Sequence, residues 1–136
     1  MKIYTSYFAR AGQLKRNGIE PICIAVGTPK YFTGCSYKRL APRRDMLYMN
    51  EQMYRREFAN IMAKLNPQQV LIDLKRLAGR VGNVALCCYE KPSDFCHRHL
   101  VAEWLNQSLG IEVVEYEAEQ AAKTKNEKQA TQQSLF

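Results

Sequence analysis

Short apolar runs alternate with helical segments along the chain, and this alternation restricts the fold more than any other feature. The run 84–89 is the most strand-like part of the sequence, because six apolar residues follow one another there. Apolar side chains at helical spacing, with Asn50 available as a cap, predict an amphipathic helix over 50–65, and Pro67 opens a second one that ends before Gly79. Further predicted strands cover 4–8, 22–26 and 111–116, and a further helix covers 95–105.

Strands that alternate with helices predict a three-layer, Rossmann-like α/β fold, with a mainly parallel sheet and helices on both faces. With 136 residues, of which 46% are hydrophobic and 24% charged, the chain fits one domain. We expect this domain to span 1–118 and a polar tail to span 119–136, since 120–131 contain almost no large apolar residue. In such folds ligands bind beyond the carboxyl ends of the strands.

Apolar runs and cysteines together predict the compartment. No apolar run reaches the roughly 18 residues that a membrane span needs, and the start of the chain has the pattern of a strand instead of a signal peptide. The five cysteines are odd in number and stand mostly among apolar residues, which makes a disulfide framework unexpected. The sequence therefore predicts a soluble, cytoplasmic protein with free thiols.

Positive charge is concentrated in the first third of the chain. The formal net charge is +7, and residues 1–44 contain nine Lys or Arg side chains and one acidic one. The densest basic patch consists of Lys38, Arg39, Arg43 and Arg44, within a long loop over 28–47 that contains Pro and Gly and has no periodicity. Such a patch favours a polyanion such as nucleic acid or a phosphorylated ligand, although a solvated basic loop has the same composition.

The segment 86–105 contains the reactive side chains. A buried strand ends at Glu90, and Ser93 or Asp94 can cap the helix that follows, so Cys96 and Arg98 lie near free backbone N–H groups. This position attracts anions and lowers the pKa of a thiol. Cys96 is therefore a candidate nucleophile with a partly exposed thiol, Arg98 a candidate ligand for phosphate or carboxylate, and His97 or Glu90 a candidate proton carrier.

Two other interpretations fit the same segment. In the first, Cys96 packs as a small apolar residue while Arg98 pairs with Glu90 or Asp94. In the second, Cys88, Cys96 and His97 offer three metal ligands and Cys35 a fourth. That spacing matches no familiar zinc module, so we predict neither a metal nor another cofactor.

The same segment resembles a known family. Cys-Tyr-Glu-Lys at 88–91, Cys-His-Arg at 96–98 and Ala-Glu-Trp-Leu at 102–105 are similar to the bacterial and phage family called domain of unknown function 488, DUF488. Residues 3–8 and 37–44 look like its shorter members. The resemblance implies an α/β fold and a site formed by Glu90, Cys96, His97 and Arg98, and it implies no reaction.

Polar residues at strand ends extend the candidate site. If the sheet is wound as predicted, Ser6 and Tyr7 end the first strand, Thr28 follows the second, and Tyr89 lies at the end of the third. We expect these four residues to join Arg98 in binding a ligand. For Ser6 and Thr28, ordinary polar residues at strand ends are the alternative interpretation.

The last five residues have the pattern of a docking peptide. Gln132 is followed by two spacer residues and then by Leu135 and Phe136, which is similar to the peptide by which bacterial polymerases and repair proteins bind the sliding clamp. A tail that dangles, or one that folds back onto the domain, is the alternative. The sequence thus leaves two functions open: an enzyme that acts on a nucleotide or nucleic acid, or a non-catalytic adaptor or inhibitor on a replication or repair complex.

Overall fold

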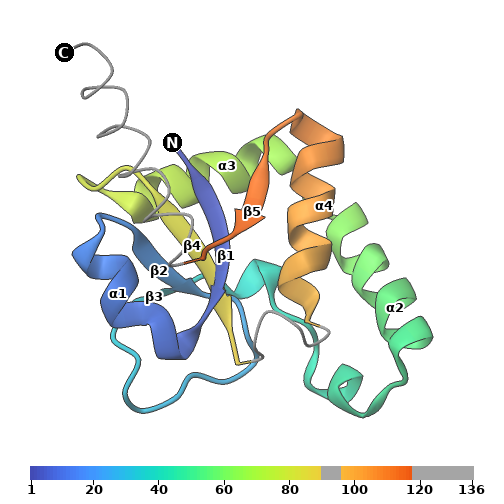
Figure 1. Cartoon of the computed structure of the whole chain (residues 1–136). Helices are drawn as coiled ribbons and strands as arrows, with labels where there is room; N and C mark the ends of the chain where they lie inside the picture. The colour runs from blue at the N-terminus through green and yellow to red at the C-terminus, as the bar shows by residue number, and fades with distance from the viewer. Residues whose placement is uncertain (90–95, 118–136) are drawn as a thin grey trace, which may run out of the picture.

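The computed structural model describes residues 1–89 and 96–117, and they form a parallel five-stranded sheet with the strand order β3-β2-β4-β1-β5 (Figure 1). The predicted three-layer α/β fold is confirmed. The strands are β1 (Ile3–Tyr7), β2 (Glu20–Cys23), β3 (Cys35–Ser36), β4 (Val84–Cys88) and β5 (Val113–Glu115). The helices are α1 (Ala11–Arg16), α2 (Glu51–Ala63), α3 (Pro67–Ala78) and α4 (His97–Leu109). Within the described residues, three 3₁₀ helices complete the elements: η1 (Phe8–Arg10), η2 (Lys38–Leu40) and η3 (Arg44–Tyr48).

The helices lie on the two faces of the sheet. The connection from β1 to β2 runs through α1 on one face, whereas α2, α3 and α4 lie on the other (Figure 1). Parallel connections that move in opposite directions along a sheet place their helices on opposite faces, because each crossover is right-handed. The loops after β2 and β4 therefore emerge side by side at the carboxyl edge of the sheet.

Each face of the sheet has its own apolar core. On the face covered by α2, α3 and α4, Leu86 of β4 packs with Phe58, Leu74 and Val101. On the opposite face, Phe8, Leu14 and Cys87 pack together with Phe32. Because β4 lies in the middle of the sheet, all five of its residues are buried, as expected for a strand covered on both sides.

The two helices predicted between Asn50 and Gly79 are confirmed, although α2 ends at Ala63, two residues before the predicted end. The side chain of Asn50 accepts a hydrogen bond from the backbone N–H of Met53 at 2.8 Å, and α2 begins at the next residue. Pro67 occupies the first turn of α3, where its missing N–H costs nothing, and Asn66 is the cap. Gly79 ends α3 with a φ of 59°, a backbone conformation that favours glycine.

Other boundaries differ from the sequence-based predictions. The loop expected over 28–47 includes the strand β3, which has two residues and pairs with β2. Helix α4 begins at His97 with Cys96 as its N-cap, so the prediction that Ser93 or Asp94 caps it is wrong, and these two residues themselves lie outside the described part of the chain. Within 1–89 and 96–117, no helix has the length and apolar character that crossing a membrane requires.

Candidate functional site

A pocket opens at the carboxyl ends of β2 and β4, where an α/β fold of this kind binds ligands. Its volume is about 360 Å³, within the range of small-molecule sites. The lining comes from residues 25–27 after β2, from Cys88 and Tyr89 at the end of β4, from Cys96 and His97 at the start of α4, and from side chains between Pro42 and Tyr54. We call it the β2–β4 pocket.

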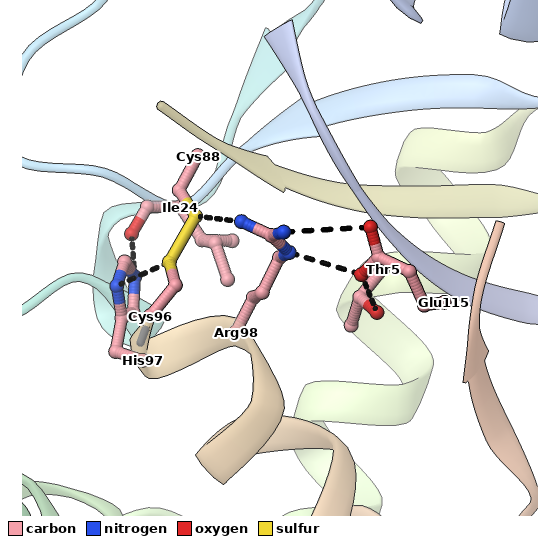
Figure 2. Close-up of a disulfide and its surroundings, with 7 residues drawn as sticks. All are labelled: Thr5, Ile24, Cys88, Cys96, His97, Arg98 and Glu115. Carbon is pink, nitrogen blue, oxygen red and sulfur yellow. Dashed lines mark hydrogen bonds and ion pairs between the residues drawn. A yellow bond between two sulfur atoms is a disulfide. The ribbon is translucent and has the colours of Figure 1, made fainter. Parts of the chain in front are cut away.

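Cys88 and Cys96 form a disulfide at the base of this pocket (Figure 2). Cys96 is 3% exposed, so the predictions of a free, partly exposed Cys96 thiol and of a chain without disulfides are both wrong. The physical reason is the position of α4. This helix packs against β4, and its N-cap residue therefore lies beside the last residue of that strand.

Cys23, Cys35 and Cys87 remain free thiols. Burial raises the pKa of Cys87 to about 12, so this thiol stays protonated at neutral pH. Cys35 lies on β3, where its Sγ donates to a carboxylate oxygen of Glu20 at 3.6 Å. The predicted alternative with Cys35 as a fourth metal ligand is therefore wrong, because Cys35 does not belong to the cluster of Cys88, Cys96 and His97.

His97, which lines the pocket, is held in one orientation. Its Nε2 donates to the backbone carbonyl of Ile24 at 2.5 Å, which leaves Nδ1 as the unprotonated nitrogen, 3.7 Å from Sγ of Cys96. The ring of Phe58 packs against the imidazole with a centroid separation of 5.3 Å. Burial lowers the pKa of His97 to about 4, so the ring is neutral at physiological pH.

Arg98 lies between the disulfide and Glu115 (Figure 2) and does not line the pocket. The side chain is fully buried, and Nε and Nη2 donate to the carboxylate of Glu115 at 3.0 and 3.4 Å. Nη1 donates to Sγ of Cys88 at 2.8 Å, and Thr5 adds a hydrogen bond to Glu115 at 2.7 Å. One interpretation of the sequence paired Arg98 with Glu90 or Asp94. The structure shows an ion pair of Arg98 with Glu115 on β5 instead.

The residues predicted at strand ends separate into two groups. Tyr89 lines the pocket, is 53% exposed, and packs edge-on against Phe8. The other three do not line it. Ser6 is fully buried in β1, the hydroxyl of Tyr7 accepts from Arg10 at 2.9 Å, and Thr28 is exposed with its hydroxyl 3.3 Å from Sγ of Cys23.

The basic patch forms part of the loop that walls the pocket. Lys38 donates to the backbone carbonyls of Ala25 and Val26 at 2.7 and 3.2 Å, so it fixes two lining residues. Arg43 forms ion pairs with Asp45 and Glu57. Arg39 and Arg44 are exposed to solvent. Two of the four basic residues therefore stabilise the loop, and two present their charge to solvent.

Sequence patterns missed several residues of the site. Met46, Met49 and Tyr54 form a wall of the pocket, and no periodicity in 42–49 indicated this. Glu115, the partner of Arg98, had no signal of its own, because the predicted strand 111–116 contains a second acidic residue, Glu112, which is exposed. Glu90 and the tail residues Gln132, Leu135 and Phe136 lie outside the described residues, so their roles stay predictions.

Comparison with known families gives one match. A family model described as DUF488-N3a, active DUF488-N3 subclade, covers residues 27–109, a range that includes β4, Cys-His-Arg at 96–98 and every residue that lines the pocket except Ala25 and Val26. Searches of curated proteins and of solved structures gave no match.

Proposed function

Since the chain belongs to the DUF488 family, we propose that it acts on a nucleotide bound in the β2–β4 pocket, beside Cys96 and His97 at the start of α4. One observation supports the proposal most strongly. The pocket combines an exposed aromatic ring, the Cys96 and His97 side chains, and a wall that continues into the basic patch. A ligand with a planar base and a charged phosphate matches this combination.

The nucleobase of such a ligand would have apolar and aromatic partners in the pocket. Tyr89 has half of its side-chain surface open, and Tyr54 and Met46 contribute further apolar lining. Aromatic side chains bind nucleobases by stacking, whichever base is present. The volume of about 360 Å³ accommodates a nucleoside with its phosphates directed towards the opening.

The phosphates have two sources of positive potential. Helix α4 begins at His97, so the positive end of its dipole and its first backbone N–H groups face the pocket. Arg39 and Arg44 add exposed guanidinium groups on the loop that forms the pocket wall. Phosphate binding of this kind weakens as salt screens the charges, so we expect the affinity to fall with ionic strength.

Replacing Tyr89 with Ala tests the base-binding role. Loss of one stacking partner costs about 1–3 kcal/mol, so a nucleotide should bind the Tyr89→Ala variant about tenfold more weakly. Isothermal titration calorimetry with nucleoside mono-, di- and triphosphates measures this difference. Tyr31→Ala is the matched control, because Tyr31 is 64% exposed and does not line the pocket.

Two results would contradict the proposal. In one, no nucleotide binds the intact protein at low salt. In the other, Tyr31→Ala and Tyr89→Ala weaken binding equally, which would place the ligand outside the pocket.

A further inference from the structure

Three potential metal ligands meet at the base of the β2–β4 pocket. The two Sγ atoms of Cys88 and Cys96 and a ring nitrogen of His97 lie within 4.8 Å of one another, and all three residues are buried (Figure 2). We propose that in the reduced protein these three side chains bind one Zn²⁺ ion, with the fourth coordination position open to the pocket. This inference does not depend on nucleotide binding.

The distances suit a tetrahedral ion. Zinc bond lengths of about 2.3 Å to sulfur and 2.0–2.1 Å to nitrogen place a sulfur and a nitrogen ligand ~3.6 Å apart. Sγ of Cys96 and Nδ1 of His97 are 3.7 Å apart. The Cα atoms of Cys88 and Cys96 are 7.5 Å apart, beyond the roughly 4.4–6.8 Å typical of disulfides, so the backbone leaves room for an ion between two thiolates.

The surrounding groups fit metal ligands. A histidine that binds a metal usually donates its other ring N–H to a carbonyl or carboxylate, and Nε2 of His97 donates to the carbonyl of Ile24. Nη1 of Arg98 donates to Sγ of Cys88 at 2.8 Å, a contact that stabilises a thiolate. Two thiolates neutralise the charge of Zn²⁺, and Glu115 pairs with Arg98, so the buried group as a whole carries little net charge.

Two thiolates and one imidazole favour zinc over hard divalent ions, and the fourth coordination position distinguishes a catalytic from a structural zinc site. Thiolate and imidazole ligands favour zinc over magnesium or calcium, which prefer oxygen ligands. Structural zinc sites have four protein ligands, whereas catalytic sites have three and leave one position for water or substrate. Cys88, Cys96 and His97 all line the pocket, so a ligand there reaches the fourth position.

The metal-bound and disulfide forms differ by two electrons. An added phosphine supplies these electrons to the S–S bond, which breaks, and the phosphine becomes the phosphine oxide. Water provides the oxygen of that oxide and the two protons, one of which each sulfur takes up. Zinc then displaces both thiol protons, and the sulfurs move apart to ~3.8 Å, the separation that two zinc–sulfur bonds require. The disulfide between Cys88 and Cys96 is the oxidised form of the proposed site, in which neither sulfur is a thiolate.

Zinc content measures the proposal directly. The whole chain is reduced with a phosphine, mixed with one equivalent of Zn²⁺, desalted and analysed by mass spectrometry of the metal. We expect one zinc per chain in the wild type and in Cys35→Ser, since Cys35 lies on β3 and contacts Glu20. Cys96→Ser and Cys88→Ser should bind zinc more than 100-fold more weakly, a larger effect than loss of an outer-shell partner.

Cobalt substitution keeps the test independent of how the variants fold. Co²⁺ in the reduced wild-type chain should give the charge-transfer and visible bands of a tetrahedral ion with thiolate ligands. Reduced wild-type chain that retains no zinc, or cobalt bands that lack the thiolate transition, would overturn the proposal. So would equal zinc loss in Cys35→Ser and Cys96→Ser. Zinc binding without nucleotide binding would leave this inference intact and reject only the proposed function.

Discussion

Glu115→Gln should lower the free energy of unfolding by about 3–5 kcal/mol, the typical cost of removing one partner of a buried ion pair. Glu115 places its carboxylate against the guanidinium of Arg98, which is fully buried. A neutral amide retains the shape of the side chain but withdraws the negative charge that balances this cation. The amide also replaces one acceptor oxygen by an NH2 donor, so Nη2 of Arg98 loses its acceptor, which adds to the loss.

Urea unfolding followed by circular dichroism measures the effect. Glu112→Gln is the matched control, because Glu112 is exposed in the segment that leads into β5, and its substitution should change stability by less than about 0.5 kcal/mol. If Glu115→Gln is as stable as Glu112→Gln, the ion pair contributes nothing measurable and Arg98 does not hold β5 against α4.

Phe58→Ala should cost about 3–5 kcal/mol, because it removes a fully buried ring and leaves a cavity between α2 and the sheet. The ring also packs against His97, so the imidazole loses a neighbour that fixes its orientation. The same variant should therefore weaken whatever the β2–β4 pocket binds, in addition to lowering stability.

Thermal unfolding and ligand titration separate these two effects. Tyr48→Ala removes an aromatic ring of similar size at a position that is 90% exposed, and it should change stability by less than about 0.5 kcal/mol. A stability of Phe58→Ala equal to that of Tyr48→Ala would contradict the described packing of α2 against the sheet.

The sequence predicted those parts of the fold that have strong local patterns. The helix after Asn50 has apolar residues at helical spacing and a capping side chain, and Pro67 marks the start of the next helix, so both were located from the sequence. The two-residue strand β3 has no pattern of its own, because its only regular feature is its pairing with β2.

The candidate site was predictable in part. Cys96, His97 and Tyr89 lie at the pocket as expected, because the end of a strand and the start of the next helix are neighbours in a parallel α/β fold. The roles of Arg98 and Cys96 were not predictable from local sequence. Arg98, on helix α4, pairs with Glu115 on strand β5, and Cys96 bonds to Cys88 across eight positions of sequence.

The position of β1 governs when this domain acquires its structure during translation. β1 lies between β4 and β5, with Ile3 paired to Val84 and to Val113, and β2 also pairs with β4. Strands β1 and β2 have no contact with each other in the sheet, so a nascent chain that ends before residue 84 lacks the strand that joins them. The sheet therefore forms only after β4 has left the ribosome, and until then the two earlier strands lack the strand that pairs with both of them.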